Sequence, residues 1–209
     1  MRQKSERTNN EIMWSSEFGN DYTKRQKKDL KGRYEFFDKA LFEVAEVEKC
    51  NTVCEFGANI GENIRTLEKL FKVYSPAEKM EFSAIEINKK CCDKLSEYAF
   101  VYNQSVEKPI KEKFDLVFTR GLLIHLEKEV LDKAIKNIYN SSNKYILIAE
   151  YITPERRMVE YRGKKDMMWT DDYFKPLIKK GCELIDCGFD YKYFITWALL
   201  LKGGKNGKR

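Results

Sequence analysis

The pattern of apolar and polar positions predicts strands that alternate with helices from Thr52 onward. Short apolar runs bounded by glycine or polar residues predict strands, and apolar residues three or four positions apart predict amphipathic helices. We expect strands at 52–56, 81–87, 99–103, 114–119 and 144–149, and helices at 62–71, 88–98 and 127–139. Strands that alternate with helices of this length indicate right-handed crossovers in a parallel sheet.

The two ends of the chain depart from this alternation. The first fifty residues are polar and helical in pattern, with an amphipathic helix expected at 34–47. The aromatic-rich stretch 13–22 before it is typical of a cap over another surface rather than of a regular element. After a helix expected at 171–180, the apolar runs 182–192 and 194–202 predict two strands in an antiparallel hairpin.

Length and composition favour one globular α/β domain. The chain has 209 residues, of which 43% are hydrophobic, enough to bury a core. We expect a helical N-terminal cap or lid at 1–50, a main domain at 51–202 and a flexible tail at 203–209. The N-terminus lacks the apolar core of a signal peptide, and no run approaches the roughly 18 apolar residues of a membrane span. A soluble, cytoplasmic protein without a membrane partner is therefore expected.

Net charge and cysteine content bear on nucleic-acid binding, on metal binding and on the state of the thiols. The net charge of +6 is a small excess of 39 basic over 33 acidic residues, which is typical of a solvated surface of mixed charge. We therefore expect no nucleic-acid partner. The six cysteines form no CxxC pair and there is one histidine, so no metal site is expected. Without a secretory leader, the thiols are expected to be reduced and mostly buried.

A glycine loop follows the first predicted strand, in the sequence VCEFGANIGEN at 53–63. It is not a phosphate-binding P-loop, because glutamate and asparagine follow Gly61 where GxxxxGK[ST] requires lysine and a hydroxyl residue. It also lacks the third glycine of the dinucleotide pattern GxGxxG. Glu55 would repel a pyrophosphate, but it can accept hydrogen bonds from an ammonium group. The loop is therefore suited to a zwitterionic or cationic ligand.

The spacing ExGxxxGxN at 55–63 resembles motif I of the class I S-adenosylmethionine-dependent methyltransferases. FDLVFTRGLLIHL at 114–126 is similar to the fourth strand of that family and the loop after it. The resemblance covers roughly 52–202. It implies a Rossmann-like fold with a mostly parallel seven-stranded sheet, a C-terminal antiparallel hairpin and a helical N-terminal cap. It also implies S-adenosylmethionine as the cofactor and S-adenosylhomocysteine as its product.

The resemblance also implies which residues contact the cofactor. In this family the acid of motif I and the loop hold the methionine end, and an acid at the tip of the second strand binds the ribose hydroxyls. Glu86 in FSAIEIN is similar to that second acid. Gln104 and Ser105 follow the third strand, where the family contacts adenine, although the usual acid is missing. The implied cofactor-binding set is Glu55, Gly57, Asn59, Gly61, Asn63, Glu86, Ile87, Gln104, Ser105, Thr119 and Arg120.

Methyl transfer requires an aligned donor and acceptor, and removal of a proton when the acceptor is a hydroxyl or an ammonium group. His125, the only histidine, follows the fourth predicted strand. A neutral imidazole can act as the general base near neutral pH; alternatively, His125 caps or packs its helix. Arg120 and Arg162 could bind a carboxylate or phosphate of the acceptor; alternatively, each forms a surface salt bridge.

A finer resemblance concerns the acceptor. The stretches at 14–25, 119–126 and 161–166 are similar to methyltransferases found with pseudaminic acid biosynthesis, although Ser15 and Ser16 depart from that pattern. The resemblance implies a sugar, or a nucleotide-activated sugar, of a bacterial surface-glycan pathway. Residues expected around the acceptor are Trp14, Phe18, Tyr22, Tyr151, Tyr161 and Arg162. The first three would form a lid that excludes water, or a hydrophobic seal over the sheet.

Three other functions stay open on the sequence. The chain could methylate a different small molecule, or it could bind the cofactor without catalysis. It could also methylate nucleic acid, although base-modifying enzymes often carry [ND]PP[YFW] after the fourth strand, where this chain has TRGL at 119–122. A basic stripe with interleaved aromatic residues, typical of single-strand binding, is also missing from the sequence.

Overall fold

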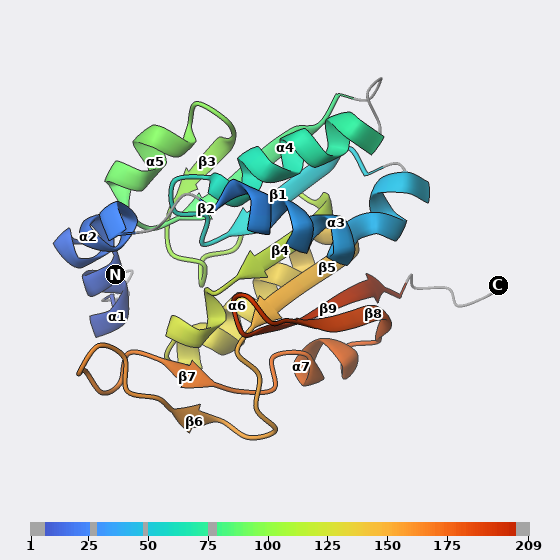
Figure 1. The fold of residues 1–209 in the computed structure, drawn as a ribbon. Coiled ribbons are helices and arrows are strands. Elements are labelled where there is room, and N and C mark those ends of the chain that lie inside the picture. Colours follow the sequence, from blue (N-terminus) through green and yellow to red (C-terminus); the bar gives the residue numbers. More distant parts are fainter. Residues whose placement is uncertain (1–6, 26–28, 48–49, 75–78, 204–209) are drawn as a thin grey trace.

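The structure, a computed structural model, describes residues 7–25, 29–47, 50–74 and 79–203. Residues 204–209 of the expected tail lie outside the described residues. Within the described residues, one sheet of seven strands has the order β3-β2-β1-β4-β5-β9-β8 (Figure 1). The strands are β1 (Thr52–Phe56), β2 (Glu81–Glu86), β3 (Phe100–Asn103), β4 (Phe114–Arg120), β5 (Ser142–Glu150), β8 (Cys182–Asp190) and β9 (Ile195–Lys202).

The direction of the strands confirms the predicted fold class. Strands β1 to β5 are parallel to their neighbours, and β9 is antiparallel to both β5 and β8. The predicted hairpin therefore forms one edge of a mostly parallel sheet. Each predicted strand agrees with an observed strand to within about two residues at either end, because strand boundaries are set by hydrogen bonding as well as by composition.

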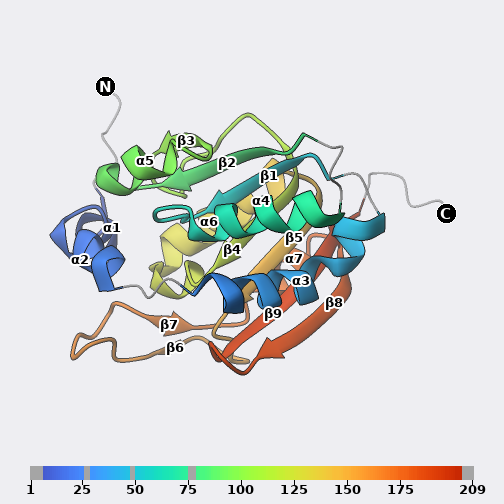
Figure 2. The same ribbon diagram turned by 45° about the horizontal axis from the view of Figure 1, so that its top comes forward.

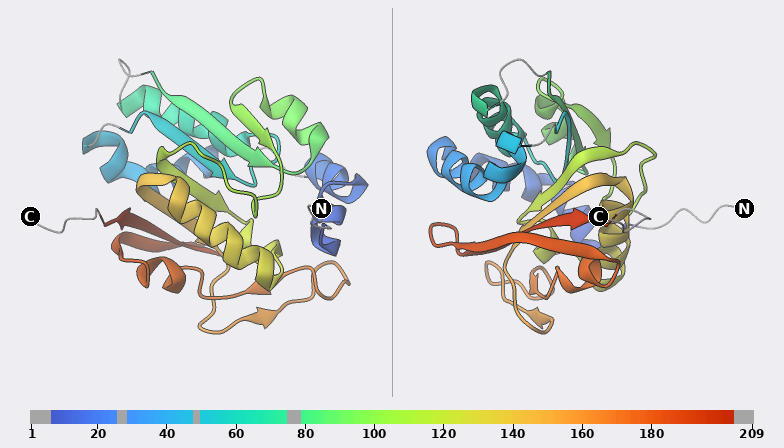
Figure 3. Two further views of the ribbon diagram at one scale, coloured as in Figure 1. Left: turned by 180° about the vertical axis from the view of Figure 1, so that it is seen from behind. Right: turned by 90° about the vertical axis from the view of Figure 1, so that its right-hand side faces the viewer.

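Helices cover both faces of the sheet (Figures 2 and 3). Helices α3 (Leu30–Val47) and α4 (Glu62–Tyr74) lie on one face, and α6 (Lys128–Ser141) and α7 (Lys175–Ile178) on the other. Helix α5 (Lys89–Leu95) connects β2 to β3. No helix among the described residues has the length and apolar character that a membrane crossing requires.

Strand β4 illustrates why the sequences of the central strands are continuous apolar runs. Leu116 and Phe118 pack in the cluster with α3 and α4, whereas Val117 packs in the cluster with α6 and α7. Successive side chains of a strand point to opposite faces of a sheet, so a strand covered on both faces needs apolar residues at every position.

The N-terminal segment corrects the expectation of an irregular cap at 13–22. It forms α1 (Asn9–Trp14) and α2 (Glu17–Arg25), which lie beside the carboxyl ends of the strands (Figure 1). Thr8 begins α1 with a capping box, in which its hydroxyl accepts from the Glu11 N–H and its own N–H donates to the Glu11 carboxylate. A Cβ on Gly19 would lie 2.1 Å from the Trp14 carbonyl oxygen, so this glycine permits the tight packing of α2 on α1.

Two further differences lie between β5 and β8. Helix α7 is shorter than the predicted 171–180, because the Asp172 carboxylate accepts hydrogen bonds from the N–H groups of Phe174 and Lys175 and holds a turn there. The sequence did not predict the antiparallel pair β6 (Arg157–Met158) and β7 (Trp169–Thr170). Two-residue strands are too short to leave a periodic pattern.

Candidate active site

A cavity of about 730 Å³ lies at the carboxyl ends of β1, β2 and β4, beneath the cap helices α1 and α2. The order of the strands reverses at β1, which has β2 on one side and β4 on the other. Open α/β sheets bind their ligands at such a switch point. The volume lies within the range of roughly 300–1,000 Å³ that is usual for small-molecule sites.

The glycine loop between β1 and α4 forms one wall of this cavity. Gly57 and Gly61 have φ angles of +76° and +81°, and a Cβ on either would lie 2.6 Å from a leucine side chain. Asn59 between them also has a positive φ of 50°. The loop therefore needs glycine at both ends to turn tightly, and this turn exposes its backbone at 57–60 to the cavity.

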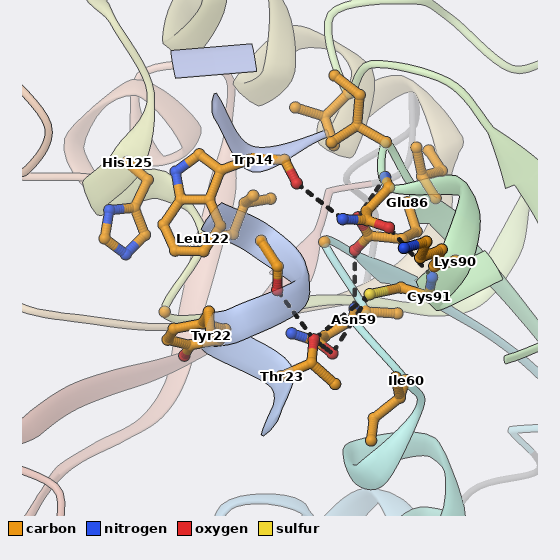
Figure 4. Close-up of a pocket in the computed structure, with 18 of the residues that line it drawn as sticks. Trp14, Tyr22, Thr23, Asn59, Ile60, Glu86, Lys90, Cys91, Leu122 and His125 are labelled. Carbon is orange, nitrogen blue, oxygen red and sulfur yellow. Dashed lines mark hydrogen bonds between the residues drawn. The ribbon is translucent and has the colours of Figure 1, made fainter. Parts of the chain in front are cut away.

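Glu86, the last residue of β2, holds the loop in place. One carboxylate oxygen accepts from the Asn59 N–H and the other from the Asn88 N–H, each at 2.8 Å (Figure 4). Burial raises the pKa of Glu86, and the backbone N–H groups of Asn88 and Asn59 act in the opposite direction. Glu86 lines the cavity, so its remaining lone pairs can accept hydrogen bonds from hydroxyl groups of a ligand.

Glu55 lies behind the cavity wall rather than in it. Its carboxyl group accepts from the Asn63 amide at 2.6 Å, and the Asn63 carbonyl accepts from the Arg33 guanidinium at 2.6 Å. Burial raises the pKa of Glu55 to about 8, and its second oxygen has no hydrogen-bond partner. Glu55 therefore orients Asn63 and Arg33, both of which line the cavity.

Arg120 follows the apolar run of β4 and points its guanidinium into the same cavity wall. The group lies 5.0 Å from the ring centroid of Phe36 and 4.3 Å from that of Tyr193. Within the described part of the chain it forms no salt bridge, and its Nε and Nη2 groups are buried without a partner. The surface salt bridge considered for Arg120 is therefore wrong.

His125 ends a short 3-10 helix, η1 (Leu123–His125), and lines the cavity. Its Nδ1 lies 3.0 Å from the Met167 carbonyl oxygen, which can only accept, so Nδ1 carries the proton and Nε2 is free to accept one. Burial lowers the pKa of His125 to about 4. The ring lies 4.6 Å from that of Trp14 and 5.2 Å from that of Tyr161, so His125 is neutral and tightly packed.

Glu150 at the end of β5 fixes the turn that carries His125. One of its oxygens accepts from the Thr119 hydroxyl and from the N–H groups of Leu122 and Leu123, each at 3.0 Å. Thr119 and Glu150 are fully buried and neither lines the cavity. Thr119 therefore supports the turn and does not line the cavity, although the family resemblance implied that it contacts the cofactor.

The cap helices contact both the glycine loop and the residue that caps α5. The Thr23 hydroxyl of α2 donates to the Asn59 side chain at 2.9 Å, and the Asn88 amide donates to the Trp14 carbonyl at 3.1 Å (Figure 4). Thr23, Arg33 and Asn88 were not among the site residues predicted from the sequence. Asn88 could have been found as the N-cap residue of α5, which its side chain caps through the Cys91 N–H. Thr23 and Arg33 carry no such sequence signal.

The cavity divides the predicted site residues into two groups. Those that line it are Trp14, Tyr22, Gly57, Asn59, Asn63, Glu86, Ile87, Ser105, Arg120 and His125. Those that do not line it are Phe18, Glu55, Gly61, Gln104, Thr119, Tyr151, Tyr161 and Arg162. The Gln104 side chain instead donates to the Lys108 carbonyl, and Arg162 is exposed in a tight turn between Tyr161 and Lys164.

Comparison with known proteins identifies the fold. No family model and no curated protein matches the sequence. The magnesium protoporphyrin IX methyltransferase of Synechocystis PCC 6803, solved with bound S-adenosylmethionine, is similar with a TM-score of 0.65 and 14% identity, over 96% of this chain and 100% of that one. CalS10, an amino pentose methyltransferase of Micromonospora echinaspora, is similar with a TM-score of 0.63 and 8% identity, over 90% of this chain and 97% of that one. The chain therefore has the class I methyltransferase fold that its sequence predicts.

Proposed function

We propose that the chain is an S-adenosylmethionine-dependent methyltransferase that acts on a small polar acceptor. The observation that carries this proposal is the arrangement of two buried acids and a glycine loop around one cavity. Glu86 faces the cavity at the end of β2, and Glu55 supports its wall at the end of β1. A fold neighbour that holds S-adenosylmethionine, the Synechocystis enzyme, supports this choice of cofactor.

The residues present fit this cofactor. Glu86 offers a carboxylate to the ribose hydroxyls, and the exposed loop backbone at 57–60 offers polar groups to the aminoacyl end. The Glu55 carboxyl does not line the cavity, but it holds the Asn63 amide, which does line it and can contact the aminoacyl end of the cofactor. When bound, the cofactor would supply a methyl group activated by a sulfonium charge.

His125 is the proposed proton acceptor. Its Nε2 is unprotonated because Nδ1 is bonded to the Met167 carbonyl, and its ring contacts Trp14 of the cap. A hydroxyl group of the acceptor, hydrogen-bonded to Nε2, would transfer its proton there as its oxygen accepts the methyl group. An ammonium group would lose its proton to Nε2 first, which frees the lone pair of its nitrogen for the methyl group. Trp14 and Tyr22 line the cavity on the cap side, where they would exclude water.

The proposed acceptor is a sugar, or a nucleotide-activated sugar, of a bacterial surface-glycan pathway. The resemblance at 14–25 and 161–166 supports this assignment, and CalS10 shows that the fold is used for an amino pentose. A different small molecule is the alternative, because the same fold in Synechocystis acts on magnesium protoporphyrin IX. Nothing in the cavity requires a nucleic-acid acceptor.

The first experiment tests the cofactor and the second tests the acceptor. Mass spectrometry of the denatured protein would detect co-purified S-adenosylhomocysteine, and calorimetry would measure its affinity. A screen of sugars and nucleotide sugars with S-adenosylmethionine would then detect the mass gain of one methylene unit. Failure of the wild-type protein to bind S-adenosylhomocysteine would contradict the proposed function.

A further inference from the structure

Two arginines share one region of the cavity wall, and neither forms a salt bridge with another residue that the structure describes. Arg33 comes from α3 and Arg120 from the end of β4, and both line the cavity. Burial lowers the pKa of Arg120, and the positive charge of Arg33 lowers it further. In contrast, Arg65 at the same cavity pairs with the Glu62 carboxylate at 3.4 Å.

The hydrogen-bond donors of this pair are incompletely satisfied. Nε and Nη2 of Arg120 and Nε of Arg33 are buried without a partner, and the partner of Arg33 Nη1 is the neutral Asn63 amide. Buried charges in proteins are normally paired, because an unpaired charge loses its hydration without compensation. Glu55 provides little negative charge near neutral pH, because burial raises its pKa to about 8. A bound anion would compensate the charge of both guanidinium groups.

The surroundings of the pair place it away from the ribose-binding end of the cavity. Glu86 lies on β2, whereas Arg120 lies on β4, with β1 between these two strands. Arg120 packs against Tyr193 of the β8–β9 hairpin, and Tyr22 of the cap lines the same cavity as both arginines. Arg120 therefore lies on the opposite side of β1 from Glu86.

We propose that Arg33 and Arg120 bind a carboxylate or phosphate group of the acceptor, so that the methylated substrate is an acidic small molecule. The inference rests on the proposed function, because it assigns the second ligand of the same cavity. Guanidinium groups match carboxylate and phosphate oxygens with paired hydrogen bonds. A neutral acceptor would leave the positive charges of both arginines without a compensating anion.

The test uses full-length protein saturated with S-adenosylhomocysteine and three probes: D-glucuronate, glucose 1-phosphate and neutral glucose. NMR titration should detect binding of at least one of the acidic probes and no binding of glucose. Which acidic probe binds distinguishes a carboxylate from a phosphate ligand. Arg120→Gln and Arg33→Gln should each weaken that binding about tenfold or more, because a hydrogen bond to a charged group is lost. Arg120→Lys, which keeps the charge but loses the paired N–H groups of the guanidinium, should also weaken binding of that probe.

A control variant and three contrary results distinguish a failure of this inference from a failure of the proposed function. Arg157→Gln removes the same charge from the exposed strand β6 and should leave probe binding unchanged. Glucose binding as tightly as the acidic probes would overturn the inference. So would a tenfold loss of S-adenosylhomocysteine affinity in Arg33→Gln and Arg120→Gln with unchanged affinity for 5′-methylthioadenosine, because the pair would then serve the cofactor's own carboxylate. If the wild-type protein binds no S-adenosylhomocysteine, the proposed function itself fails.

Discussion

The Glu86 carboxylate accepts one backbone hydrogen bond through each of its oxygens, from Asn59 in the glycine loop and from Asn88 at the start of α5. It is 8% exposed, and that exposed part faces the cavity. One side chain thus fixes the loop that forms the cavity wall and also provides an acceptor for a ligand. A residue with both roles tolerates little change, because any substitution alters the loop and the binding surface together.

We expect Glu86→Gln to weaken S-adenosylhomocysteine binding about tenfold or more. The amide would place its NH₂ group against one of the two backbone N–H donors, and the charge offered to the ribose hydroxyls would be lost, at a cost of about 1.5–3 kcal/mol. Calorimetry measures the change. Glu81→Gln, at the exposed opposite end of the same strand, is the matched control and should bind normally. Equal affinities for wild type and Glu86→Gln would remove Glu86 from the site.

His125 offers a second test at the residue scale, because it is the only histidine in the chain. Burial lowers its pKa from 6.5 to about 4, so we expect the imidazole to stay neutral at pH 5, with the proton on Nδ1. The ¹⁵N chemical shifts of its ring report both the tautomer and the titration without ambiguity. A midpoint near 6.5, or a proton on Nε2, would contradict the buried geometry and the proposed direction of proton transfer.

At the scale of elements, the turn after β4 depends on the strand beside it. Residues 122–124 donate three backbone N–H groups to the Glu150 carboxylate at the end of β5, and Thr119 donates its hydroxyl. A buried carboxyl group can satisfy several donors because its two oxygens offer several lone pairs. Two neighbouring strands thereby determine where His125 lies in the cavity.

We expect Glu150→Ala to destabilise the protein by about 3 kcal/mol, because it leaves several buried donors unsatisfied at a cost of about 1–3 kcal/mol each before relaxation. Glu150→Gln is the informative control. Its amide oxygen can keep the three hydrogen bonds of the oxygen that contacts Thr119, Leu122 and Leu123, so it should lose far less. Urea denaturation measures both variants. Similar losses for Ala and Gln would show that the charge, not the hydrogen bonding, supports the turn.

At the scale of the whole molecule, the periodicity of apolar residues predicted the strands of the sheet, but it did not predict all the residues that line the cavity. The runs that became β1, β4 and β5 are buried on both faces, which makes them the clearest signals in the sequence. The residues of the glycine loop could be recognised because the glycines and the acid of the motif lie within a few positions of one another in the sequence. Arg33 and Thr23 are different, because they reach the cavity from helices far away in sequence, and only the packing of the cap on the sheet brings them there.

The buried titratable groups also act together on the stability of the whole molecule. Burial raises the pKa of Glu55 to about 8 and that of Glu150 to about 7, from an unfolded value near 4.5, so the native state holds protons that the unfolded state releases. Their contribution to stability is complete below pH 4.5 and is lost as the pH rises through 7 and 8. His125 acts in the opposite direction: its lowered pKa makes stability fall as the pH drops from 6.5 towards 4.

Above pH 6.5 the histidine is mostly neutral in both states, so the carboxyl groups dominate the titration of this set. We therefore expect the free energy of unfolding to fall between pH 6.5 and 8, on the order of 2 kcal/mol, since one proton corresponds to about 1.4 kcal/mol per pH unit. Urea denaturation at several pH values measures this slope. Glu55→Gln and Glu150→Gln should each flatten it, because an amide does not titrate, whereas Glu81→Gln should not. A stability that stays constant over this interval in the wild type would mean that both buried acids are already ionised in the native state.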